Sequence, residues 1–256
     1  MTQEGVGFLR ERTLFLAWED RRLTRAWFPI GRLDITPHNK VYRFTYIQGA
    51  RRAEAAVGFV PLPDFPEWDR TYVSAVLFPL FMNRVIKSSR PDFPKYLQLL
   101  DLPDPSNPAD ILTVGGGRRN TDNFEVFPKL ERKTDGSFES RFFLHGWRHL
   151  NPDGQARILR LAPGEGLYVT VESTNPVMKL AVQIQTEDYY VIGWAPRYLV
   201  AELVQVLANP LNEYKAAVVR LNPAPAPLMQ RLLIELKGRW PNYQPMSSPD
   251  FEPLVA

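Results

Sequence analysis

Apolar and polar positions alternate with a period of two along much of the second half of the chain. Residues 167–172 and 179–185 each place every second apolar side chain on one face, which is typical of strands with one buried side. Asn175-Pro176 lies between them and predicts a turn, because the residue before proline is kept out of the helical region. Residues 189–192 form a third extended run, and the apolar spacing after Pro196 predicts an amphipathic helix.

The first half shows the same period over residues 13–18, 25–33 and 41–46, with a turn predicted at residues 36–40. A proline-rich connector over residues 102–108 and a polar turn over residues 129–137 separate the halves. We therefore expect one domain over residues 1–135, a second over 136–240, and an extended or disordered tail over 241–256. Leucines 228, 232, 233 and 236 predict a short C-terminal helix capped by Gly238.

Composition excludes several kinds of chemistry. The 256 residues are 45% hydrophobic, which suffices for a real core, and they contain no cysteine. Disulfides, thiolate catalysis and cysteine-ligated zinc are therefore excluded. The first residues carry no basic and then apolar leader, and the most apolar run, residues 74–86, is short and interrupted by Pro79 and Asn83. We expect a cytoplasmic protein that makes no membrane contact.

The charge balance is only weakly basic. The chain holds 31 Lys and Arg against 28 Asp and Glu, while residues 137–222 hold eight of each sign. Phosphate binding by that region therefore depends on local clustering, for example of Arg148, Lys179 and Arg197. The most basic stretch, residues 21–52, is interpreted as a solvated face, with a phosphate-binding patch as the alternative.

A glycine-rich basic loop follows an apolar run in the middle of the chain. Residues 111–120 predict a strand that runs into this loop, which contains Gly116, Gly117, Arg118 and Arg119. Its backbone amides suit a phosphate, although the loop lacks the Gly-Lys-Ser/Thr ending of a nucleotide-binding loop. A plain hairpin turn with solvated arginines is the alternative.

Candidate catalytic groups are scarce. There are three histidines, of which His145 and His149 are four residues apart, with Asp153 as the nearest carboxylate for a metal site. Ordinary surface or core histidines are the other interpretation, and no serine lies in a Gly-x-Ser-x-Gly elbow. We expect no enzyme, no metal and no cofactor.

Several motifs of the second half occur in the order found in the HIRAN domain. They are residues 142–149, residues 163–167, Glu172, Asn175-Pro176 and residues 193–197. The region from about residue 138 to 222 resembles this family. The resemblance implies a small β-barrel that recognises a single-stranded DNA 3′ end.

The resemblance also identifies candidate binding residues. Arg148 and Asn175 match the family's base-stacking and hydroxyl-binding pocket, whereas His149 and Leu150 stand where the family has two tyrosines. Val177-Met178 stands where it has Tyr-Asp. Beside an arginine, Trp194 is either a stacking platform or part of the core. The candidate nucleic-acid-binding residues are Arg148, His149, Asn175, Lys179, Trp194 and Arg197.

The first half resembles a different family. Residues 30–33, 42–46 and 74–80 are similar to segments of the N-terminal subdomain of HipA-type toxin kinases, over residues 10–100. That resemblance implies a protein-contacting role, and the HRD-like and DFG-like kinase loops are missing from the sequence.

Together these features predict an α+β chain: an N-terminal small β-sheet with helices, then a C-terminal HIRAN-like small β-barrel with one amphipathic helix. The expected function is a non-enzymatic bacterial module that binds single-stranded DNA or a DNA end, in an antiphage defence or DNA-repair system. The alternative is a protein-interaction or antitoxin-like regulatory subunit of a HipA-type kinase or of a nuclease or helicase component. The first expectation rests on the ordered set of HIRAN-like residues. The alternative rests on the HipA-like first half and on the neutral second half with its changed pocket residues, and the defence role rests on family association alone.

Overall fold

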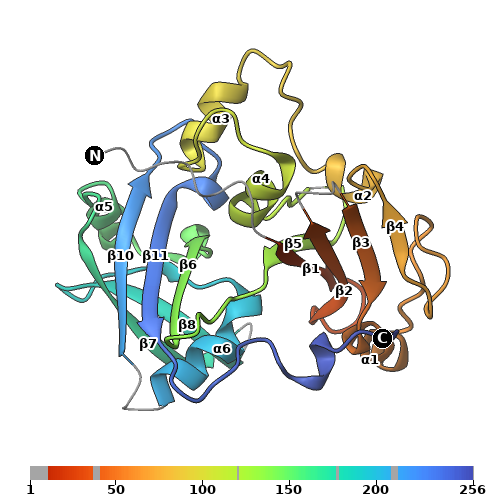
Figure 1. The fold of residues 1–256 in the computed structure, drawn as a ribbon. Helices are drawn as coiled ribbons and strands as arrows, with labels where there is room; N and C mark the ends of the chain where they lie inside the picture. Colours follow the sequence, from red (N-terminus) through yellow and green to blue (C-terminus); the bar gives the residue numbers. More distant parts are fainter. Residues whose placement is uncertain (1–10, 37–40, 120, 177–178, 209–212, 256) are drawn as a thin grey trace. The chain divides into compact units, whose positions relative to one another are not determined.

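The computed structural model describes residues 11–36, 41–119, 121–176, 179–208 and 213–255. These residues form an α+β structure with two antiparallel sheets and six α-helices. Contacts divide the chain into two compact units (Figure 1). Unit 1 comprises residues 1–87, 108–129 and 246–256, and unit 2 comprises residues 88–107 and 130–245. Residues 108–129 and 246–256 thus rejoin unit 1 after segments that belong to unit 2. The domain boundary expected at residue 135 stays a prediction.

Unit 1 is built on a five-stranded sheet with the order β4-β3-β2-β1-β5. Its strands are β1 (Arg12–Glu19), β2 (Trp27–Thr36), β3 (Val41–Tyr46), β4 (Tyr72–Ser74) and β5 (Phe124–Pro128). The three strands predicted in the first half are confirmed, and the turn expected between the second and third falls largely on residues 37–40, outside the described residues. Aromatic rings fill the core, where Phe44 stacks on Phe65 at 3.9 Å between ring centroids.

Three helices belong to unit 1: α1 (Gln48–Val57), α2 (Pro79–Met82) and α4 (Pro108–Gly115). The last one corrects the strand predicted over residues 111–115. Pro108 suits a first helical position, and Ala109 and Leu112 are buried three residues apart on one helical face. The β-branched run that suggested a strand is overridden by this packing.

Unit 2 is built on a six-stranded sheet with the order β6-β11-β10-β7-β8-β9. Its strands are β6 (Ser137–Phe143), β7 (Gly166–Asn175), β8 (Lys179–Thr186), β9 (Val191–Trp194), β10 (Glu213–Leu221) and β11 (Leu232–Arg239). The closed barrel expected from the HIRAN resemblance is wrong. Among the described residues, the edge strands β6 and β9 are joined only by a bridge between His145 and Trp194. Gly146, with φ of +82°, turns the chain away directly after that bridge, so the pairing cannot continue.

The predicted C-terminal helix is also wrong, because residues 232–239 form β11 between β6 and β10. Leucines four residues apart share a face in a strand as well as in a helix, and two neighbouring strands here supply the backbone partners. Residues 246–255 pack within unit 1 rather than forming a free tail. The amide of Leu254 donates to the carbonyl of Tyr46 at 2.9 Å, and the ring centroid of Phe251 lies 4.7 Å from that of Phe15.

The α-helices of unit 2 are α3 (Phe93–Leu99), α5 (Pro152–Ile158) and α6 (Arg197–Ala208). The amphipathic helix predicted after Pro196 is confirmed as α6, which buries Leu199, Leu203 and Val206. In the part of the chain that is described, no helix combines the length and the apolar character needed to cross a bilayer.

Candidate nucleic-acid interface

Trp194 lies at the end of β9, and its indole is held in place by a carboxylate. The indole Nε1 donates to Glu172 Oε2 at 2.6 Å. The side-chain amide of Asn175 donates to the same oxygen at 3.0 Å. All three side chains are half-buried. The structure therefore brings the predicted residues Asn175 and Trp194 together through Glu172. The sequence analysis named Glu172 only as one of the HIRAN-like positions and not as a binding residue.

The strand register explains how residues of β7 and β9 meet across β8. Trp194 pairs with Gln183 on β8, and Glu172 pairs with Ala181. Directly paired side chains point to the same face of a sheet, so the indole and the carboxylate share one face. Ala181 is 2% exposed, and its small side chain leaves room for the indole to reach Glu172.

A second contact fixes the other side of the indole. The backbones of His145 and Trp194 exchange two hydrogen bonds, at 2.9 and 3.1 Å. A Cβ atom added at Gly146 would lie 2.7 Å from Cζ3 of Trp194, a separation that real Cβ atoms essentially never show. The ring therefore packs directly on the glycine backbone, and its position is set by contacts with Glu172 on β7 and with Gly146 after β6.

The other predicted binding residues are basic side chains in the turn after Gly146, in the β7–β8 hairpin and at the start of α6. Arg148 and His149 lie in the short 3-10 turn that follows Gly146, and both are exposed. Lys179 is exposed as well and pairs with Asn175 in the β7–β8 hairpin. Among the described residues, neither Arg148 nor Lys179 forms an ion pair, which leaves their charges available for phosphates. Arg197 begins α6, three residues after Trp194.

Three of the positions where the HIRAN family has its pocket tyrosines and aspartate are not among the described residues of this face. Leu150 is only 7% exposed, so it belongs to the core rather than to a binding surface. Val177 and Met178 lie outside the described residues. Within the described residues, no group of three or more His, Asp or Glu side chains is placed to hold a metal ion.

A second group of aromatic residues lies on the same sheet face and was missed from the sequence. Tyr168 and Tyr189 stack with centroids 5.6 Å apart and an interplanar angle of 26°. Tyr168 shares its face with Glu172, since both lie at even positions of β7. The signal in the sequence was the alternation of Tyr168 with buried Leu167 and Val169.

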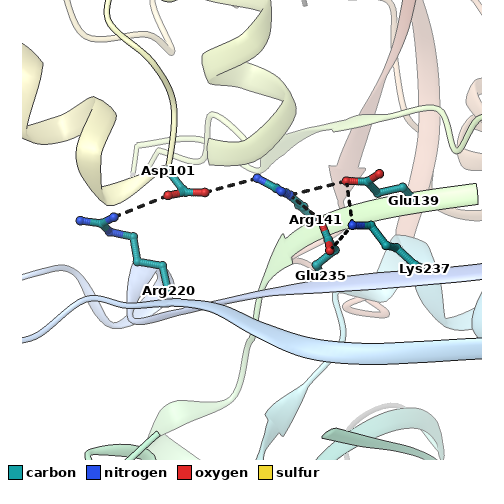
Figure 2. Close-up of polar contacts among 6 residues, drawn as sticks. All are labelled: Asp101, Glu139, Arg141, Arg220, Glu235 and Lys237. Atoms are coloured by element: carbon teal, nitrogen blue, oxygen red, sulfur yellow. Dashed lines mark hydrogen bonds and ion pairs between the residues drawn. The ribbon is translucent and has the colours of Figure 1, made fainter. Parts of the chain in front are cut away.

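Another cluster of charges lies on β6, β10, β11 and the turn after α3 of the same unit, and its charges largely neutralise one another. Figure 2 shows a row of contacts from Arg220 through Asp101 to Arg141 and then to three further side chains. Arg141 Nε lies 2.9 Å from Glu235 and 3.8 Å from Glu139, and Lys237 contacts both glutamates. Three cations thus face three carboxylates, which leaves little net charge for a ligand.

The two glutamates of this cluster differ in acidity. Burial and a hydrogen bond with Glu235 raise the pKa of Glu139. Burial also raises the pKa of Glu235, but hydrogen bonds from Lys237, Glu139 and Arg141 outweigh it and leave that pKa lowered. The pair therefore places its proton preferentially on Glu139.

The glycine-rich loop of unit 1 follows the C-terminal end of α4. The amide of Gly116 donates to the carbonyl of Leu112 at 3.0 Å, and the carbonyl of Gly117 accepts from the guanidinium of Arg84 at 3.0 Å. Phosphate sites use helix N-termini, where amides are directed outward, whereas a C-terminal end carries partial negative charge.

The two arginines of this loop differ in their surroundings. Arg118 lies 3.8 Å from Glu125 and 5.3 Å from the ring centroid of Trp27. Arg119 is exposed. Phosphate binding at this loop stays a prediction, and it has less geometric support than the face around Trp194.

Comparisons with known proteins are distant. No protein-family model matches the chain, and no curated protein does so significantly. A protein from Lactobacillus plantarum with a known crystal structure is 20% identical in sequence to this chain. The match covers 40% of this chain and 97% of that protein, with a TM-score of 0.32. The HIRAN domain of human HLTF is 15% identical, with 43% of this chain covering 75% of that one and a TM-score of 0.29. Likenesses this distant carry no argument about function, and none of the comparisons supports the expected HipA-like region.

Proposed function

We propose that unit 2 is a non-enzymatic module that binds single-stranded DNA on the face of β7, β8 and β9 that carries Trp194. The observation that carries this proposal is the fixed position of the indole. Nε1 donates to Glu172 at 2.6 Å, and the ring packs on Gly146. An aromatic ring that is already ordered before binding loses little conformational entropy when a base stacks on it.

The chemistry of this face favours unpaired bases over a duplex. Base stacking on Trp194 requires an open π-face, which a paired base inside a duplex does not present. Thr170 and Gln183 lie beside the indole on the same face and are able to exchange hydrogen bonds with base edges. A single-stranded ligand therefore uses both the ring and its polar neighbours.

The charge of the face sets the expected salt dependence. Arg148, Lys179 and Arg197 supply at most three phosphate contacts. At about −0.7 per contact for a single strand, the slope of log K against log salt is about −2. The affinity is therefore modest at physiological salt, as expected for a region of residues 137–222 with eight charges of each sign.

Recognition of a DNA 3′ end, implied by the HIRAN resemblance, is the finer part of the proposal. The hydrogen bond from Asn175 to Glu172 at 3.0 Å supports a role for Asn175 in holding the Trp194 partner, which is separate from reading a terminal hydroxyl. Hydroxyl recognition by Asn175 predicts that Asn175→Ala removes any preference for 3′-tailed DNA, whereas a role in holding Glu172 predicts that it weakens 3′-tailed and fully single-stranded DNA alike. A place in defence or repair is a further expectation from family association alone.

Fluorescence anisotropy with labelled single-stranded, 3′-tailed and blunt duplex DNA at low salt tests the proposal. We expect Trp194→Ala to weaken single-strand binding about tenfold and Trp194→Phe to retain most of it, because phenylalanine keeps a stacking ring. Arg148→Ala is expected to weaken binding and to reduce the salt slope by about 0.7.

The matched control is Arg118→Ala in unit 1, which removes an exposed arginine outside this face. Equal losses for Arg148→Ala and Arg118→Ala would contradict the assignment. Absence of binding to all three DNAs at micromolar protein refutes it, and a stoichiometric kinase, nuclease or helicase component co-purified without DNA would then favour the protein-interaction alternative.

A further inference from the structure

A second aromatic platform lies on the DNA-binding face proposed above. Tyr189 is 73% exposed and Tyr168 is 45% exposed as whole residues. The two rings stack on each other with centroids 5.6 Å apart. Exposed tyrosine rings on a binding face can stack on bases. Ordering them costs little conformational entropy, because each side chain has only two torsions.

The backbone at Tyr189 adopts a conformation that is unfavourable for a bulky residue. Its φ of +66° lies in the left-handed region, which glycine and asparagine adopt at lower cost than a bulky residue. The turn itself is closed by Thr186, whose carbonyl accepts from the Tyr189 amide at 2.9 Å and whose hydroxyl accepts from the Tyr190 amide at 3.0 Å. These hydrogen bonds use only the backbone amides of Tyr189 and Tyr190, so a smaller residue at position 189 would keep them.

An ion pair of Asp188, the residue before Tyr189, restrains this turn. Arg157 Nε lies 2.9 Å from Asp188, and the same guanidinium contacts Glu165. Thr186 is fully buried. The Tyr189 ring therefore projects from a fixed base rather than from a loosely held loop.

The spacing of the two platforms suits one nucleic-acid strand. Tyr168 and Glu172 are four residues apart on the same face of β7, which corresponds to about 13 Å, and Glu172 contacts the Trp194 indole. Stacked bases follow each other at about 3.4 Å, so this distance along β7 corresponds to about four stacked steps. Gln183 and Gln185 line the interval and are joined by a hydrogen bond of 2.8 Å.

We propose that the Tyr168–Tyr189 pair is a second base-stacking subsite for the strand that is bound at Trp194. This inference rests on the proposed function and extends it: the ligand is a single strand long enough to reach both platforms, and a dinucleotide occupies only the Trp194 end. Affinity therefore rises with strand length until both platforms are covered.

Binding of a dinucleotide and of an oligonucleotide of about eight residues, to the full chain and its variants, tests this subsite. We expect Tyr189→Gly, which suits the left-handed backbone, to weaken binding of the longer strand about tenfold and to leave dinucleotide binding unchanged. Tyr168→Thr, which keeps a strand-forming residue, is expected to act in the same direction. Tyr189→Phe is the matched control and is expected to bind both ligands like the parent.

The outcomes separate the two proposals. If Trp194→Ala weakens both ligands while Tyr189→Gly and Tyr168→Thr change neither, the second subsite is overturned and the proposed function stands. If the parent protein binds neither ligand, both proposals are overturned. Equal weakening of dinucleotide and longer strand by Tyr189→Gly also overturns the subsite, because the ring would then act on the Trp194 end.

Discussion

Replacing Gly146 by alanine tests whether the Trp194 indole is packed as described. Two costs add at this position. The φ of +82° is unfavourable for any residue with a Cβ atom by about 1–2 kcal/mol. The new methyl group would also lie 2.7 Å from Cζ3 of Trp194, and forced overpacking of this kind costs about 1–3 kcal/mol. Gly146→Ala should therefore lower the free energy of unfolding by about 2–5 kcal/mol.

Gly164 supplies the matched control within the same unit. Its φ is +87°, but a Cβ atom added there meets nothing within 4 Å. Gly164→Ala carries the backbone cost alone, about 1–2 kcal/mol. The difference between the two variants, measured by urea unfolding followed by circular dichroism, isolates the contact with the indole.

A double-mutant cycle sharpens this comparison. In a Trp194→Ala background the indole is gone, so Gly146→Ala should cost no more than Gly164→Ala. The structural reasoning is wrong if Gly146→Ala is no worse than the control in the parent protein, or if its extra cost survives removal of the indole.

Two predictions concern acid–base behaviour, each followed by urea unfolding across pH. The hydrogen bond from Arg157 lowers the pKa of Asp188 to about 2, so this ion pair contributes stability above the unfolded pKa near 3.8 and loses it as pH falls toward 2. Asp188→Asn should therefore be less stable than the parent at neutral pH and converge with it in acid; an unchanged difference across pH would contradict this. The raised pKa of Glu139 means that its ionisation opposes folding, so Glu139→Gln should be more stable at neutral pH, with a gain that disappears as pH falls below about 4. A loss at neutral pH would show that the ion pairs with Arg141 and Lys237 outweigh burial.

Local pattern predicted much of the fold but failed where two periods coincide. The strands at residues 13–18, 167–172 and 179–185 were recognisable because every second side chain is apolar. Leucines 228, 232 and 236 satisfy both the helical and the strand period, and only the neighbouring strands β6 and β10 made this segment β11. In the reverse case, residues 111–115 have strand-forming side chains but pack as helix α4.

The sequence identified individual residues of the candidate site, but only the structure showed which of them are in contact. The sequence pointed to Asn175, Trp194 and Arg148 one by one, but the partners that hold the indole are 22 and 48 residues away along the chain. Glu172 reaches Trp194 only because β8 lies between their strands with Ala181 in register. The Tyr168–Tyr189 pair likewise depends on the turn that follows β8.

By itself the sequence determined several of the extended segments, among them residues 13–18, 167–172 and 179–185, that cysteine chemistry is excluded, and that residues 137–222 carry no net charge. These properties follow from local sterics and from composition, which need no knowledge of neighbours. The tertiary structure alone decided that the sheet of unit 2 is not a closed barrel, that β11 is a strand, and that Glu172, Gly146 and Trp194 meet. Strand order and register are set by the packing of residues far apart in the chain, and a shift of one residue would send each of these side chains to the opposite face.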